Sequence, residues 1–312
     1  MNILVGYTGF VGSNLHNQYN FDGVYNSKNI MDAFSSSPDL CVYAGVRAEK
    51  FLANVDPSAD MAVVKNAYEN IKRINPKRLV LISTIDVFKT PYNCDENTLV
   101  EENGLHAYGL NRRHLEKQCA ASIENCHVIR LPGLFGKNIK KNFIYDLIHI
   151  LPSALSEAKY SAFSEKETAI KSNYTKQNNG FYKLATVTDS EHIELLEAFT
   201  RLKFSALSFT DSRAVFQFYN LDNLWEHINF SISNEIHLLH LAVEPIPAYE
   251  LYTAIRGGGF FNEATVNPPY YNFKTIYADR LGGRDSYICS KQRIIDDIRE
   301  FVTNYKLLPW LA

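Results

Sequence analysis

The sequence lacks the features that would predict binding to a membrane or to nucleic acid. No apolar run approaches the roughly 20 residues that a membrane-spanning helix needs. An excess of one charge is also missing, because 32 lysines and arginines stand against 34 aspartates and glutamates. Balanced charge gives no general attraction to nucleic acid or to an anionic membrane surface. We therefore expect a soluble protein with neither partner, and a cytoplasmic one, because the sequence opens on a strand pattern without a signal peptide.

Cysteine is also scarce, and the few present form no recognisable pattern. The five cysteines are an odd number, and none belongs to a CxxC pair. This excludes a disulfide framework or a zinc site as the organising principle, so we interpret them as reduced packing residues. His237 and His240 lie on one expected strand, but an odd separation turns them to opposite faces. We therefore expect no metal site.

Strands and helices alternate along the first half of the chain. Continuous apolar runs predict buried strands, and 3.6-residue periodicity predicts helices between them. The expected strands are 2–6, 23–26, 39–45, 78–84 and 127–131, and the expected helices are 10–19, 57–75 and 107–122. This alternation predicts an α/β fold with a doubly wound parallel sheet of the Rossmann type. Residues 1–150 should form this domain, with further strand and helix returns near 212–230.

The second half has a weaker pattern. Residues 151–312 are expected to form mainly a smaller α/β substrate-binding part, after an amphipathic helix at 141–151. The stretch 152–180 is polar and predicts an insertion or a mobile region. Later segments predict strands at 214–219 and 236–241, a helix starting at 222 and a closing helix at 291–304.

Three glycines follow the first strand at intervals of three, as Gly6-x-x-Gly9-x-x-Gly12. A glycine turn lets the backbone approach a pyrophosphate, and the start of the following helix attracts the anion. The pattern predicts a dinucleotide site, with Thr8, Phe10 and Val11 completing its contact surface. The alternative is an ordinary strand-to-helix turn that uses three glycines.

Two further motifs strengthen this prediction. Ser83-Thr84-Ile85-Asp86-Val87-Phe88 ends the fourth expected strand, and Tyr108-Gly109-Leu110-Asn111-Arg112 opens a helix. Together with the glycine turn, Arg130-Leu131-Pro132-Gly133 and Phe135-Gly136, they resemble the extended short-chain dehydrogenases/reductases. Within that family the layout resembles the NAD(P)-dependent sugar-nucleotide epimerases, dehydratases and reductases, and most of all the dTDP-4-dehydrorhamnose reductase type. The resemblance covers roughly residues 1–150.

The resemblance implies that Tyr108 is the catalytic acid/base and that Thr84 offers a hydroxyl to the same substrate oxygen. Tyr108 and Arg112 share a helix face, being four residues apart. The family normally has lysine where this sequence has Arg112, next to the nicotinamide ribose. Guanidinium supplies the positive charge, but it does not readily release a proton. The alternative for Tyr108 is a purely structural role, as a half-buried tyrosine with a hydrogen-bonded hydroxyl.

Cofactor choice depends on the end of the second strand, where a carboxylate would bind the adenosine ribose of NAD. Asn26, Ser27 and Lys28 stand there instead, which favours NADP(H) over NAD(H). The resemblance also places Ala44 and Gly45 beneath the cofactor as backbone contacts.

For the substrate, the resemblance implies a nucleotide-linked sugar. The candidate contacts are Ser83, which could replace Thr84 if the register slips, Asp86, Arg47 with Lys50 beside it, and Asn142 with Lys140 and Lys141 near it. Solvated side chains are the alternative for the basic residues. A dehydratase would want a Thr-Asp-Glu run, which Thr84-Ile85-Asp86 does not supply.

The sequence thus predicts an NAD(P)-dependent reductase or epimerase of a nucleotide sugar, with a role in surface polysaccharide synthesis implied by the resemblance alone. The alternative is a catalytically silent NAD(P)-binding sensor or scaffold, which Arg112 favours. The resemblance also suggests a homodimer through segments near 60–75 and 107–122, with a monomer as the alternative.

Overall fold

The computed structural model describes residues 1–306, and these group into two compact units. The first unit combines Met1–Ile139, Val215–Ile246 and Pro269–Asp297. The second combines Lys140–Ala214 and Pro247–Pro268 with the described residues from 298 onward. The first unit thus ends earlier than the expected 1–150, and the chain returns to it twice.

A six-stranded sheet forms the centre of the first unit, and all its strand pairs are parallel. Its spatial order is β12-β5-β4-β3-β1-β2, which confirms the expected doubly wound α/β fold. The strands are β1 (Asn2–Val5), β2 (Gly23–Tyr25), β3 (Leu40–Tyr43), β4 (Leu79–Thr84), β5 (Cys126–Leu131) and β12 (Leu238–His240).

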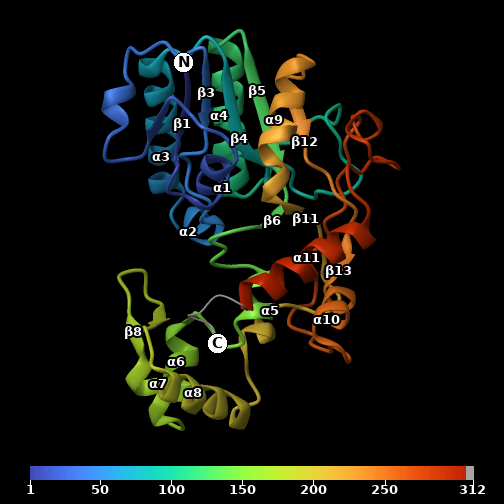
Figure 1. Cartoon of the computed structure of the whole chain (residues 1–312). Coiled ribbons are helices and arrows are strands. Elements are labelled where there is room, and N and C mark those ends of the chain that lie inside the picture. The colour runs from blue at the N-terminus through green and yellow to red at the C-terminus, as the bar shows by residue number, and fades with distance from the viewer. Residues whose placement is uncertain (307–312) are drawn as a thin grey trace. The chain divides into compact units, whose positions relative to one another are not determined.

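Helices cover both faces of this sheet (Figure 1). On one face, α3 (Pro57–Ile74) and α4 (Ala107–Ser122) pack over the strands. Their buried side chains, such as Ile71 and Leu115, join residues of β1, β3, β4 and β5 in one apolar core. On the other face, α1 (Phe10–Gln18) and α9 (Leu224–Ser233) contact each other. The core is therefore built from apolar strands whose two faces are both covered, as parallel sheets require.

Short elements complete the first unit. They are α2 (Lys50–Val55), the 3₁₀ turns η1 (Ile30–Ala33), η2 (Ile85–Val87), η4 (Leu221–Asn223) and η5 (Asp279–Leu281), and the strands β6 (Gly133–Phe135), β10 (Val215–Phe216), β11 (Phe218–Asn220) and β13 (Ile246–Pro247). β13 and α11 (Lys291–Lys306) run on into the second unit. The expected strand 214–219 is divided at Gln217, whose buried amide hydrogen-bonds the backbone of Val243 and Phe273.

The stretch 152–180 belongs to the second unit, within the segment Lys140–Ala214 that separates two stretches of the first unit in the sequence. It forms regular elements, and it shares an apolar core with the helix that follows it, including Leu155, Ile170 and Phe199. Its elements are α5 (Phe143–Ile148), β7 (Ala154–Leu155), α6 (Glu157–Ser164), α7 (Thr168–Asn173), β8 (Tyr174–Lys176), β9 (Tyr182–Leu184), α8 (Asp189–Arg201), η3 (Ala206–Phe209) and α10 (Ala248–Arg256). The expected helix 141–151 is shortened to α5.

The five cysteines are free thiols, and four of them are buried. Burial raises the pKa of the Cys41 thiol to about 12, so it packs as an uncharged group. Among residues 1–306, no helix is long and apolar enough to cross a membrane, and no group of three or more potential ligands could hold a metal ion.

Candidate active site

The glycine turn brings three backbone segments very close together. Gly6 has a positive φ of 93°, and a Cβ there would lie 2.5 Å from the carbonyl oxygen of Ala44. A Cβ on Gly12 would lie 2.1 Å from the carbonyl oxygen of Gly6. Neither position has room for a side chain, so both glycines are needed for β1 to turn directly into α1.

The start of α1 is open to solvent. Thr8 and Gly9 are exposed, and Gly9 is the N-cap residue without a side-chain cap. The first turn of α1 contains no acidic side chain. Backbone N–H groups at a helix start attract anions, so this turn fits the pyrophosphate of a dinucleotide. Phe10 and Val11, which begin the helix, are partly exposed at the same place.

The turn after β2 is shaped by Asn26. Its backbone N–H donates to Asn29 Oδ1 at 2.8 Å, and its own Oδ1 accepts from the Lys28 N–H at 2.9 Å. Asn26 is therefore a turn-forming residue, while the side chains of Ser27 and Lys28 are exposed. The end of β2 therefore presents a hydroxyl and a cation at the position where a Rossmann-type NAD site has a carboxylate.

The loop after β3 begins at the sheet edge beside the glycine turn. The N–H of Ala44 donates to the Val5 carbonyl at 2.9 Å, and Gly45 is exposed. Both residues therefore follow the carboxyl end of β3, next to that of β1, where open α/β sheets bind their ligands.

Thr84 and Tyr108 meet at the carboxyl end of β4. Thr84 is the last residue of the strand, and its hydroxyl lies close enough to the Tyr108 phenol to lower the phenol's pKa. Thr84 Oγ1 also accepts from the N–H of Asp86 at 3.1 Å. Close approach of α4 depends on Gly109, because a Cβ there would lie 2.0 Å from the Asp86 carbonyl oxygen. The Tyr-Gly pair in the sequence therefore has a packing reason.

Tyr108 is buried and uncharged at neutral pH. Burial raises the pKa of its phenol to about 12, although the Arg112 cation and the nearby Thr84 hydroxyl both lower it and the Asp86 carboxylate raises it. Its backbone N–H donates to Asn54 Oδ1 at 3.0 Å, which fixes the first turn of α4. Tyr108 thus carries its proton at neutral pH and can donate it, but its raised pKa makes it a weaker acid than a free phenol until a cofactor and substrate bind.

Arg112 is held by its own partners. Its guanidinium donates to the carboxylate of Asp60 and to the backbone carbonyl of Arg47. The Arg112 and Asp60 side chains are only 6% and 11% exposed. The guanidinium also lies against the Tyr108 ring. Arg112 therefore brings positive charge to Tyr108 from a fixed position.

A second polar group adjoins Thr84. Asp86 Oδ1 accepts from Lys50 Nζ at 2.9 Å and from the Tyr271 hydroxyl at 3.0 Å. Lys50 Nζ also contacts the Tyr271 oxygen at 3.3 Å. The sequence suggested Lys50 and Asp86 separately as substrate contacts, but it gave no signal for Tyr271, which lies far along the chain.

Two residues that were expected to contact the substrate, Ser83 and Asn142, use their side chains in other hydrogen bonds. The Ser83 hydroxyl is buried and donates to Glu116 Oε1 at 2.6 Å, on the other side of β4 from Thr84. Glu116 also pairs with the buried Arg130. Asn142 belongs to the second unit, where its Oδ1 accepts the N–H groups of Ile144 and Tyr145. The Arg47 side chain is exposed, and its backbone carbonyl accepts from Arg112.

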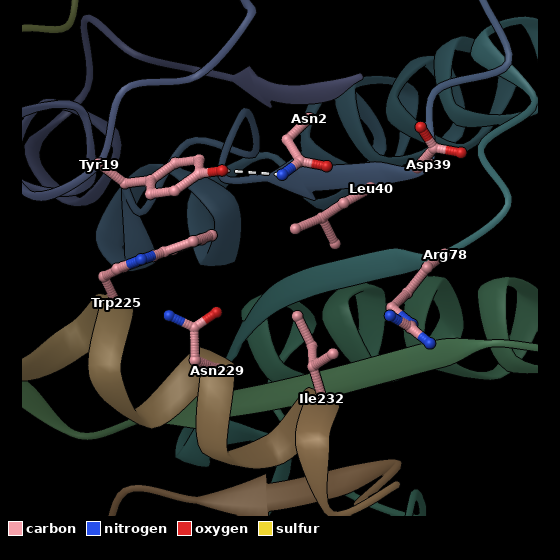
Figure 2. A pocket seen from close by; sticks show the side chains of 8 residues that line it. All are labelled: Asn2, Tyr19, Asp39, Leu40, Arg78, Trp225, Asn229 and Ile232. Atoms are coloured by element: carbon pink, nitrogen blue, oxygen red, sulfur yellow. Dashed lines mark hydrogen bonds between the residues drawn. The ribbon is translucent and has the colours of Figure 1, made fainter.

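A hollow of about 290 Å³ lies at the other end of the sheet's strands, away from the glycine turn (Figure 2). Asn2 begins β1, Leu40 begins β3, and Arg78 precedes β4, so this hollow is at the amino ends of the strands. Trp225 of α9 stacks on Tyr19 beside it, with ring centres 4.1 Å apart. Open α/β sheets bind ligands at the carboxyl ends, where Thr84 and the glycine turn lie, so this hollow is not the candidate active site.

No model of a protein family matches the sequence, and no curated sequence relative was found. Solved structures do match over almost the whole chain. A dTDP-4-dehydrorhamnose reductase from Bacillus anthracis, in complex with NADP, has a TM-score of 0.63 at 14% identity, covering 97% of this chain and 98% of its own. One from Clostridium acetobutylicum has a TM-score of 0.61 at 12% identity, covering 98% and 100%.

A UDP-glucose 4-epimerase from Thermotoga maritima, solved with UDP-glucose, has a TM-score of 0.59 at 12% identity, covering 98% of this chain and 99% of its own. The chain has the fold of these enzymes. At such identities the likeness establishes fold alone, so the site must be argued from the residues described above.

Proposed function

We propose that this protein is an NAD(P)-dependent oxidoreductase or epimerase of the extended short-chain dehydrogenase/reductase type, acting on a nucleotide-linked sugar. The observation that carries the proposal is the meeting of Thr84, Tyr108 and Arg112 at the carboxyl end of β4. The glycine turn after β1 opens at the same edge of the same parallel sheet. A phenol, an alcohol and a cation next to a dinucleotide-binding turn are the groups that carbonyl reduction needs.

The side chains divide the work of reduction as follows. The bound nicotinamide supplies the hydride. Tyr108 gives its proton to the carbonyl oxygen, and Thr84 offers a second hydrogen bond to that oxygen. Arg112 stabilises the phenolate that remains, because its positive charge lies against the ring. In the oxidative half of an epimerisation the same phenolate removes the proton from a substrate hydroxyl.

NADP(H) is the cofactor that we propose. Ser27 and Lys28 are exposed at the end of β2, where the adenosine ribose binds in this fold. A hydroxyl and an ammonium both favour the 2′-phosphate of NADP, and no carboxylate stands in the Asn26–Lys28 turn to repel it. The complex of the Bacillus anthracis reductase with NADP supports binding of a nicotinamide dinucleotide, and the preference for NADP(H) rests on Ser27 and Lys28 alone.

The test uses two substrates taken from the structural neighbours. NADPH oxidation with dTDP-4-dehydrorhamnose measures reduction, and conversion of UDP-glucose measures epimerisation. Tyr108→Phe should lower turnover by at least 100-fold with NADPH affinity kept, because one removed proton donor is worth about that much. Thr84→Val should lower turnover less.

The Arg112→Lys variant separates this proposal from a silent NAD(P)-binding sensor, which the arginine favours. An enzyme should keep or gain turnover with lysine, because lysine keeps the charge opposite Asp60 and can release a proton. A protein that binds NADPH yet turns over no nucleotide sugar, either with Arg112 or with lysine, would be a sensor, and the enzyme proposal would fail.

A further inference from the structure

The cluster of Lys50, Asp86 and Tyr271 suggests an answer to a problem that Arg112 creates. If Tyr108 donates a proton in each turnover, it must regain one before the next. Guanidinium does not release protons, and Arg112 is tied to Asp60 and to the Arg47 carbonyl. A different group has to connect Tyr108 to water.

Lys50 is the cation that combines access to water with access to the site. Its side chain is 41% exposed, whereas that of Asp86 is 18% exposed. It donates to Asp86 Oδ1 at 2.9 Å and to the Tyr271 oxygen at 3.3 Å. Lysine can lose and regain a proton, and it can do so in contact with solvent.

Asp86 links this lysine to the catalytic pair. Its backbone N–H donates to Thr84 Oγ1, and its carboxylate lies near enough to Tyr108 to raise the phenol's pKa. Tyr271 accepts from Lys50 and donates to Asp86, so it holds the carboxylate and the ammonium in one arrangement. The carboxylate is therefore held by the solvent-exposed cation and by Tyr271, and its charge acts on the buried phenol.

The segment that carries Lys50 is itself attached to α4. Lys50 and Asn54 are four residues apart in α2 and share a face. Asn54 accepts the Tyr108 N–H at 3.0 Å, and the Arg47 carbonyl just before α2 accepts from Arg112. These contacts give Lys50 a defined position relative to Tyr108.

We propose that Lys50, acting through Asp86, returns to Tyr108 the proton that Arg112 cannot supply, with Tyr271 as the positioning residue. This inference rests on the proposed function. After Tyr108 has protonated the substrate oxygen, the Lys50 ammonium gives a proton to the Asp86 carboxylate, which passes it to the phenolate across a bridging water or substrate hydroxyl. The neutral Lys50 amine then takes a proton from solvent, so that one proton enters for each one consumed.

The experiment compares Lys50→Ala, Lys50→Arg and the control Lys72→Ala with the unmodified protein in NADPH oxidation with dTDP-4-dehydrorhamnose and in conversion of UDP-glucose. Lys72 is an exposed lysine of α3 in the same unit. Lys50→Ala and Lys50→Arg should both lower kcat by about tenfold or more, because arginine keeps the charge without releasing a proton. Methylamine in the buffer should restore turnover of Lys50→Ala, and Lys72→Ala should behave like the unmodified protein.

The outcomes separate the two proposals. If the unmodified protein turns over the substrates and Lys50→Arg turns them over equally fast, Lys50 acts by charge alone and the relay is refuted. Loss of turnover in Lys50→Ala without rescue by methylamine also refutes it, because a purely structural lysine would behave in that way. If the unmodified protein turns over neither substrate, the proposed function fails and the relay with it.

Discussion

The guanidinium carbon of Arg112 lies 4.0 Å from the centre of the Tyr108 ring. The cation thus covers the face of the phenol, while its nitrogens donate to Asp60 and to the backbone of Arg47. It lowers the pKa of Tyr108, although burial outweighs it. Arg112 is therefore at once a structural ion-pair partner and an electrostatic neighbour of the candidate acid.

Removing this cation should destabilise the protein. Arg112→Ala leaves the Asp60 carboxylate, which is 11% exposed, without its cationic partner, while the Asn111 amide still donates to it at 2.7 Å. We expect the free energy of unfolding to fall by about 3 kcal/mol, the usual cost of breaking a buried pair, measured by urea denaturation. Lys72→Ala should change it by less than about 1 kcal/mol, since the Lys72–Glu69 pair is exposed. A double variant with Asp60→Ala should recover part of the loss, and no recovery would contradict this account.

Two glycines of the turn should respond differently to alanine. In Gly12→Ala the new Cβ would meet the Gly6 carbonyl at 2.1 Å, so we expect a lowered melting temperature and loss of NADPH binding. In Gly9→Ala the nearest atom would be 3.3 Å away, so the fold should survive. Its methyl group would still stand where the pyrophosphate approaches, and NADPH affinity should fall about tenfold by calorimetry. Equal melting temperatures for the two variants would show that the turn tolerates the clash.

The exposed Lys28 side chain tests the cofactor preference. Lys28→Ala should weaken NADPH binding by about tenfold, the worth of one charge-assisted contact to phosphate, and should leave NADH binding unchanged. The comparison of the two dissociation constants in one buffer is its own control. Equal weakening of both cofactors, or of neither, would remove Lys28 from the 2′-phosphate site.

Acid should destabilise the first unit through His240. Its Nε2 contacts Arg130 Nη1 at 3.1 Å and its Nδ1 contacts the Lys274 carbonyl, so the neutral ring fits best with the proton on Nδ1. Burial, together with Arg130, lowers the pKa of His240 to about 3, whereas an unfolded histidine titrates near 6.5. The unfolded state therefore takes up the proton first, and this stability is present above pH 6.5 and lost as the pH falls toward 3.

The measurement is urea unfolding of the protein and of His240→Gln at pH 6.5 and pH 5. Over that range the histidine should contribute a loss of about 2 kcal/mol, which the variant should not show. Glu96, whose pKa is raised by burial, hydrogen-bonds the His240 backbone, and its opposite contribution is common to both proteins. Parallel losses in the two proteins would contradict the role of His240.

The parts of the fold that could be predicted from sequence are those with continuous apolar patterns. The expected helix 107–122 matches α4 at both ends, and α3 ends at Ile74, where Asn75 forms a left-handed cap just before Pro76. Buried parallel strands are also apolar on both faces, so β3 and β4 were visible as uninterrupted runs. The region 152–213 was not, because its short helices and strands bury little each and carry many polar residues on the outside.

The candidate site shows the same division. Thr84 and Tyr108 could be paired from local motifs, since each sits at the end or start of a regular element. The position of Tyr271 could not be predicted from local motifs. It reaches Asp86 only through tertiary packing, against a small apolar cluster that includes Val87 and Phe273. Ser83 illustrates a limit of residue-level analogy, because one step along a strand turns a side chain to the opposite face.

The first unit is assembled from three separate stretches of chain, and this limits how it can be produced as an isolated domain. Cutting the gene after residue 139 would leave β5 without its neighbour β12, exposing a row of unpaired edge groups prone to aggregation. The same cut would delete Tyr271. A minimal nucleotide-binding fragment therefore has to splice the two returning stretches onto the first, with short linkers replacing the excised second unit.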